Sequence, residues 1–178
     1  MAPAIAPQLG FLTIFQEALG FQGGFLVTNS WGRPLEFRLS SAVAPNRVQQ
    51  ILYGSTLEEY LCADLIGKTL LEKTATAIHL LVTDNVGALA LRSRIAVPVL
   101  YLHLGEHAPT SERRLANHAH ASSSGVLYRE AALEHDATAI DDLLAGIDPS
   151  YDLAEPFSRI REAMTEARRM GGSTRGAA

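Results

Sequence analysis

The stretch Ala77-Ile78-His79-Leu80-Leu81-Val82-Thr83, followed by Asp84-Asn85, decides the fold. Its almost unbroken apolar run predicts a strand that is covered on both faces. A strand of this kind lies in the middle of a sheet. Asp84 and Asn85 favour a turn, so the strand ends there.

Three further strands are expected before this one, at residues 11–15, 25–28 and 35–39. The third alternates apolar with charged residues, which is typical of a strand with one face in water. Turn-forming residues and short connections join the three strands, so neighbours should run antiparallel. The sequence therefore predicts a β-meander.

Helices are expected on either side of the central strand. Residues 46–73 are predicted to be helical with a break at Gly54, because Asn46 can cap the first part and Ser55 with Glu58 forms a capping box for the second. Residues 86–92 have two interpretations. Their alanine and leucine content favours a short helix, whereas the flanking residues could support a hairpin turn and a returning strand.

Residues 97–102 are the predicted fifth strand.

The composition changes beyond residue 105. We expect five segments: a flexible arm at 1–10, an α/β core at 11–105, a mobile loop or linker at 106–129, C-terminal helices at 130–170 and a disordered tail at 171–178. The last helix has an apolar stripe at helical spacing, which consists of Leu153, Phe157, Ile160 and Met164.

The overall composition is that of one compact globular domain, with 47% hydrophobic and 19% charged residues among 178. A net charge of -4 does not attract nucleic-acid phosphates, so any contact with nucleic acid would have to be local. The single cysteine, Cys62, excludes an intramolecular disulfide, and its place on the apolar side of a helix predicts a buried thiol. No apolar run is long enough to span a bilayer. A cytoplasmic protein without a membrane contact is expected.

The predicted element order, β-β-β-α-β-α-β, resembles the ribonuclease H-like fold across residues 11–160. The resemblance implies a mixed five-stranded sheet with C-terminal helices. It also implies a cluster of acids that holds two divalent metal ions, Mg²⁺ or Mn²⁺, and cleaves phosphodiesters. The acids in comparable places are Glu17, Glu59 or its neighbour Glu58, Asp84, and Asp136 or His135. Glu59 is preferred to Glu58 because it shares a helix face with Cys62 and Ile66.

A roadblock- or longin-like α+β scaffold is the alternative fold. It is favoured by the strand at residues 23–28 with the tight turn after it, and it would gain if residues 86–92 formed a strand. This fold predicts no metal.

Two functions remain open on these grounds. The first is a non-catalytic binding or assembly protein without a cofactor, which would act on a protein partner or a second copy through a sheet edge and the C-terminal helix. Its contact residues would be Trp31, Arg33, Phe157, Ile160 and Met164. The second is a metal-dependent nuclease in which Glu17, Glu59, Asp84 and Asp136 are catalytic, and the first three of them hold the metal.

Overall fold

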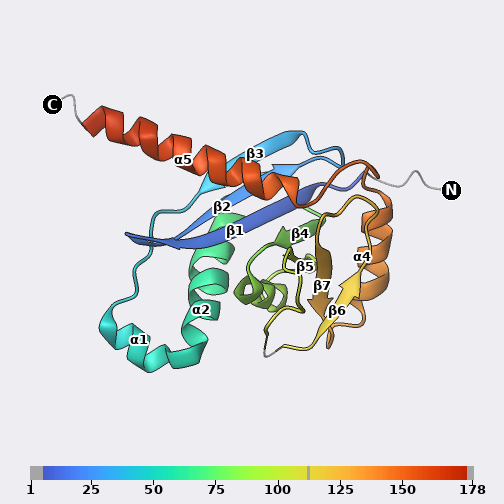
Figure 1. The fold of residues 1–178 in the computed structure, drawn as a ribbon, viewed down its shortest axis with the longest axis horizontal. Coiled ribbons are helices and arrows are strands. Elements are labelled where there is room, and N and C mark those ends of the chain that lie inside the picture. Colours follow the sequence, from blue (N-terminus) through green and yellow to red (C-terminus); the bar gives the residue numbers. More distant parts are fainter. Residues whose placement is uncertain (1–5, 112, 176–178) are drawn as a thin grey trace.

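The computed structural model describes residues 6–111 and 113–175, with side chains up to residue 171. A single mixed sheet of seven strands forms its centre, in the order β3-β2-β1-β4-β5-β7-β6 (Figure 1). The strands are β1 (Leu9–Glu17), β2 (Gly20–Thr28), β3 (Pro34–Leu39), β4 (Leu80–Thr83), β5 (Val99–His103), β6 (Leu115–His118) and β7 (Val126–Glu130).

The first five strands follow the predicted order. Strands β1, β2 and β3 form the antiparallel meander, and β4 lies parallel to β1 and to β5. The α/β class is thereby confirmed. The expected number of strands is wrong, because the sheet has seven strands and not five.

The two additional strands form where a mobile loop or linker is predicted, at residues 106–129. Strand β6 lies within this segment, and β7 ends one residue beyond it, at Glu130. Strand β7 pairs antiparallel with both β5 and β6. The two strands are only four and five residues long, and Leu127 is their single buried hydrophobic residue. Backbone pairing therefore holds them, and the hydrophobic pattern of the sequence gives little sign of it.

The helices lie on both faces of the sheet. They are α1 (Arg47–Tyr53), η1 (Gly54–Thr56), α2 (Leu57–Glu59), η2 (Tyr60–Gly67), α3 (Lys68–Lys73), η3 (Val86–Ser93), α4 (Asp136–Ala145) and α5 (Glu155–Arg175). The predicted break at Gly54 is confirmed, since this glycine has a φ of 52°. Segment η3 is a 3-10 helix, so the helical interpretation of residues 86–92 is confirmed. The returning strand that would favour the roadblock- or longin-like scaffold is not formed.

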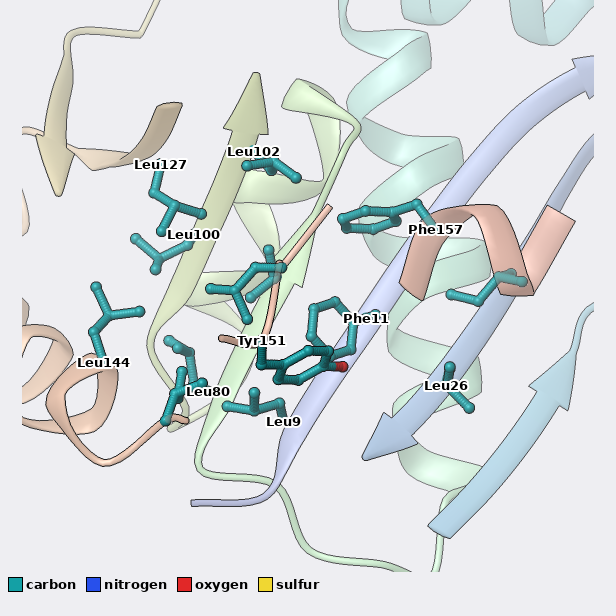
Figure 2. Close-up of a cluster of buried hydrophobic side chains, with 14 of the residues drawn as sticks. Leu9, Phe11, Leu26, Leu80, Leu100, Leu102, Leu127, Leu144, Tyr151 and Phe157 are labelled. Atoms are coloured by element: carbon teal, nitrogen blue, oxygen red, sulfur yellow. The ribbon is translucent and has the colours of Figure 1, made fainter. Parts of the chain in front are cut away.

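Two hydrophobic cores fill the space between the sheet and its helices. Figure 2 shows the core on the side of α4 and α5, where Phe11 meets the rings of Phe157 and Tyr151 edge-on at centroid distances of 5.7 and 6.2 Å. The other core lies under η2 and η3 and includes Leu12 and Cys62. Alternate residues of β1 thus enter opposite cores, as the period of a strand requires.

Two adjacent glycines in β2 allow helices to pack closely on both faces. A Cβ at Gly23 would overlap Ile66 in η2, and a Cβ at Gly24 would overlap Ile160 in α5. Neighbouring residues of a strand point to opposite faces. The pair Gly23-Gly24 therefore fixes the distance of one helix on each side of the sheet.

Helix α1 projects away from the sheet, at the lower left of Figure 1. None of its residues is buried, and the side chains of Val48, Ile51 and Leu52 are 63%, 65% and 77% exposed. Its start is nevertheless well defined, because Asn46 and Gln49 form a reciprocal capping box.

The two chain ends differ from the expectation in part. Pro7 is buried and β1 begins at Leu9, so the predicted flexible arm ends earlier than residue 10; residues 1–5 lie outside the described part. Helix α5 continues to Arg175, which places residues 171–175 of the expected tail in a helix, while 176–178 lie outside the described residues. Within the described ranges, no helix is long and apolar enough to cross a membrane.

Candidate functional site

The parallel strands β1, β4 and β5 end at the same edge of the sheet. Ligand sites of α/β proteins commonly lie at this carboxyl edge. Glu17 is the last residue of β1, and Asp84 directly follows β4. Two of the predicted acids are therefore at the edge where a site is expected.

Asp84 is held by one neighbour on the sheet and one on α5. The hydroxyl of Thr13 donates a hydrogen bond of 3.2 Å to its Oδ2, and Arg161 forms an ion pair with the same oxygen. The side chain is only 12% exposed. Burial raises the pKa of the Asp84 carboxyl above its usual value, and the charge of Arg161 opposes this increase.

Glu17 and Glu59 are also paired with arginines. Glu17 forms an ion pair with Arg168, whose guanidinium lies 5.7 Å from the centre of the Phe15 ring. The carboxylate of Glu59 lies 2.8 Å from Arg113 and 3.6 Å from Arg94. These pairs connect Glu59 to the region before β6 and to the end of η3.

Asp136 begins α4 and is 5% exposed. Arg92 donates two hydrogen bonds to its carboxylate, at 2.6 and 2.9 Å. These bonds lower the pKa of Asp136 below its ordinary value. The pair therefore has a structural role, because it joins the end of η3 to the start of α4.

The structure does not bring the four acids to a common point. Each is paired with at least one arginine, and Glu59 shares its two arginines with other acids, Arg113 with Glu130 and Arg94 with Asp64. Within residues 6–111 and 113–175, no group of three or more His, Cys, Asp or Glu side chains is arranged to hold a metal ion. The metal site of Glu17, Glu59 and Asp84 that the resemblance implied is therefore not formed. Asp136 forms an ion pair with Arg92 instead.

The expected contact residues fall into two groups. Trp31 is 73% exposed and Arg33 is also exposed, as predicted for the tip of the β2–β3 hairpin. The three helix residues are not available to a partner. Phe157, Ile160 and Met164 are 1%, 0% and 0% exposed, because the apolar stripe of α5 packs against the protein's own sheet. For these three the expected role in partner binding is wrong.

Sequence reasoning missed a groove between β3 and α5, which we call the β3 groove. Its volume is about 210 Å³, and its lining is Leu26, Pro34, Phe37, Arg159, Ile160 and Ala163. Beside it, Leu35 and Phe37 are 43% and 39% exposed. The alternation of residues 35–39 revealed the charged face of the strand. It did not reveal that the core leaves part of the apolar face uncovered.

A second missed feature is a pocket of about 490 Å³ at the carboxyl edge, on the face covered by α2; we call it the α2 pocket. Its polar lining residues include Glu58 and Asn85. The sequence pattern indicates Glu58 only as the alternative to Glu59, and Asn85 only as a turn residue. Neither pattern shows that the two side chains line one pocket.

No protein-family model matches the chain, and no curated protein matches it. Among solved structures, the chain is similar to endonuclease V of Ciona intestinalis, crystallised as a variant with a 23mer DNA that contains an inosine followed by a ribo-adenosine. The sequence identity is 7%, the TM-score is 0.44, and the match covers 94% of this chain and 89% of that chain. This is a weak likeness at the level of the fold.

Proposed function

We propose that the protein is a non-catalytic assembly module that associates with a second copy of itself through the free edge of β3. The observation that carries this proposal is the composition of that edge. Among the described residues, strand β3 is the last strand of the sheet and pairs with β2 alone. Its apolar side chains Leu35 and Phe37 are exposed, and Phe37 lines the β3 groove. An uncovered apolar edge strand is a template for strand pairing.

The backbone of β3 offers hydrogen-bonding groups on this free side. In an antiparallel pair, opposite residues alternate between hydrogen-bonded and non-hydrogen-bonded positions. Ser40 N–H donates to the carbonyl of Gly23, one position beyond the last strand pair of the β2–β3 ladder. The alternation therefore directs the backbone groups of Phe37 and Leu39 away from β2, where a new strand can pair with them, while the β2–β3 ladder shifts register at Leu35.

The sequence of β3 is complementary to itself when two copies pair antiparallel around Phe37. In this register Phe37 faces its own counterpart, and Leu35 faces Leu39 of the second copy. On the opposite face, Glu36 of one copy faces Arg38 of the other. Aromatic, aliphatic and opposite-charge pairs across strands all favour pairing, and a two-fold arrangement relates the two halves of the interface by symmetry.

The charge of Glu36 is fixed by its own chain. Its carboxylate accepts backbone hydrogen bonds from Ala75 and Thr76 at 2.8 to 3.2 Å and lies 2.8 Å from Arg38. The hydrogen bonds to Thr76, above all, lower the pKa of Glu36 to about 2. Glu36 is therefore an ionised partner for a second Arg38 at neutral pH.

The same carboxylate–arginine pairs that occupy the four predicted acids favour this proposal over a metal-dependent nuclease. A two-metal mechanism needs carboxylates whose charge is free to hold cations. Here each of the four acids would first have to give up its arginine.

Sedimentation velocity over a range of protein concentrations tests the proposal. We expect the wild-type chain to change from monomer to dimer as its concentration increases, because mass action favours association. Phe37→Lys places a charge at the centre of the edge and should keep the protein monomeric over the same range. Leu52→Lys on α1 is the matched control, since it also replaces an exposed apolar residue by lysine, and it should still dimerise.

Three outcomes would overturn the proposal: a wild-type monomer at every concentration, a dimer that survives Phe37→Lys, or a dimer that is lost in Leu52→Lys. The last would place the interface on α1. Arg38→Glu adds a test of the register, because it sets two negative charges opposite each other. It should weaken dimerisation more than Arg38→Ala does.

A further inference from the structure

We infer that the α2 pocket binds a guanidinium group carried on an apolar body, with the carboxylate of Glu58 as its counter-ion. None of the described residues lines both this pocket and the β3 groove. The inference is therefore independent of the proposed self-association.

The shape and lining of the pocket fit a small organic group. Its volume of about 490 Å³ lies in the range of small-molecule sites, which combine apolar walls with a few polar groups. The apolar walls are Ile14, Phe15, Phe21, Leu57 and Leu61, and the polar side chains are Gln16, Ser55, Glu58 and Asn85. The pocket opens at the carboxyl ends of β1 and β4, where ligands of α/β sheets commonly bind.

The charge of the pocket selects a cation. Among the described residues that line it, Glu58 alone is charged. A second pocket of about 420 Å³ shares Ser55 and Glu58 with the first, and its other charged lining residues, Glu59 and Arg113, pair with each other at 2.8 Å. In the part of the chain that the structure describes, no ion pair or hydrogen bond engages the Glu58 carboxylate. One negative charge is thus available where the two pockets meet.

Asn85 supplies a hydrogen-bond donor of fixed orientation close to Glu58, because a Cβ on Gly87 would lie 3.1 Å from Asn85 Oδ1 and 3.6 Å from Glu58 Cγ. Its Oδ1 accepts a hydrogen bond of 2.9 Å from the backbone N–H of Gly87 at the start of η3. Its amide nitrogen carries two N–H groups: one donates to the Cys62 thiol, and the other remains for a ligand. A ligand with a cation at one end and a carbonyl oxygen nearby matches Glu58 and Asn85 together.

A guanidinium fits this set better than an ammonium does. It is planar, forms paired hydrogen bonds with a carboxylate and stacks on aromatic rings, such as that of Phe21 in the pocket wall. The shared chemistry has two sources, an arginine side chain in a peptide and a free alkylguanidine. Only the peptide also offers carbonyl oxygens to Asn85.

Isothermal titration calorimetry with three probes tests the inference: a capped Ala-Arg-Ala peptide, the same peptide with citrulline in place of arginine, and agmatine. Citrulline keeps the shape of arginine and removes its charge. We expect the arginine peptide to bind at least about tenfold more tightly than the citrulline peptide, because only the former makes a charge-assisted hydrogen bond. Tighter binding of the peptide than of agmatine would identify a peptide arginine as the source; the reverse would identify a free guanidine.

Glu58→Gln should weaken binding of the arginine peptide about tenfold or more, by removal of the counter-ion. Glu58 is exposed, so this variant should fold, and its thermal unfolding checks that. Glu162→Gln on α5 is the matched control and should bind as the wild type does. Equal affinity for the arginine and citrulline peptides, an unchanged affinity in Glu58→Gln, or no binding of any probe at millimolar concentration would overturn the inference. The monomeric Phe37→Lys variant should bind the arginine peptide normally, which separates this result from the outcome for self-association.

Discussion

Arg92 and Asp136 form a bidentate pair, with Nε donating to Oδ2 at 2.6 Å and Nη2 donating to Oδ1 at 2.9 Å. Their side chains are 20% and 7% exposed. Arg92→Ala should lower the free energy of unfolding by about 3 kcal/mol, because it leaves a buried carboxylate without its cation. Urea denaturation measures this loss. Arg33→Ala, at an exposed arginine of the hairpin tip, is the control and should change stability by less than about 0.5 kcal/mol. Equal effects in the two variants would contradict the assigned role of the pair.

The Asp84–Arg161 pair should make stability depend on pH. Burial raises the pKa of Asp84 in the folded protein, so the ionised carboxylate costs stability, and this cost disappears as the pH falls through the folded pKa. Arg161→Ala removes the charge that offsets the cost. The variant should be less stable than the wild type at neutral pH, and the difference should shrink towards about pH 4 as Asp84 becomes protonated.

Denaturation midpoints of the wild type and Arg161→Ala across this range check the prediction. A loss of stability that is the same at every pH would show that Arg161 acts by packing and not through Asp84.

The close packing of α5 on β2 predicts a coupled pair of substitutions. Gly24→Ala should destabilise the protein by about 1–3 kcal/mol, because the added methyl group overlaps Cγ2 of Ile160. Ile160→Leu removes this branch and conserves the volume, so the double variant should recover part of the loss. A double-mutant cycle measures the coupling, which should exceed about 0.5 kcal/mol. Strict additivity would mean that the strain lies elsewhere.

Cys62 should be inert in the folded protein. It is 0% exposed, and burial raises the pKa of its thiol to about 12, so almost no thiolate forms at neutral pH. A thiol reagent should label the protein only as denaturant unfolds it, with one label per chain. Labelling that is rapid and complete under native conditions would show that the core under η2 opens.

Divalent metals should not stabilise the protein. The carboxylates that could hold them are paired with arginines, so millimolar Mg²⁺ or Mn²⁺ should leave the Tm unchanged, because only ligands that bind the folded state raise it. Thermal unfolding with the metal and with a chelator measures this. A rise in Tm that Asp84→Asn abolishes would instead favour the nuclease interpretation.

The sequence was sufficient to predict β1, β2, β4 and β5 because their apolar residues face cores, and β3 because apolar and charged residues alternate along it. Leu12 and Leu81 show this directly, since both are 0% exposed. It was insufficient for β6, in which the only large apolar residue is Leu115 and pairing with β7 replaces burial as the stabilising contribution. Element prediction from hydrophobic periodicity fails for strands of this kind.

The candidate site was harder to predict, since its electrostatics depend on residues far apart in the chain. Asp84 was placed correctly after its strand, yet Arg161, which balances its charge, is 77 residues away. Glu17 and Arg168 are separated by 151 residues. Residue types and spacing identify an acid near a sheet edge, but they do not show which cation neutralises it.

The projecting helix α1 also affects how the molecule opens in solution. A seven-residue helix without a buried residue has little free energy of its own, even with a capping box. Its backbone amides should therefore exchange with deuterium through local fraying, whereas those of β1 and β4 should exchange only when the whole sheet unfolds. Helix α1 can therefore unfold and refold as a separate cooperative unit while the sheet stays folded.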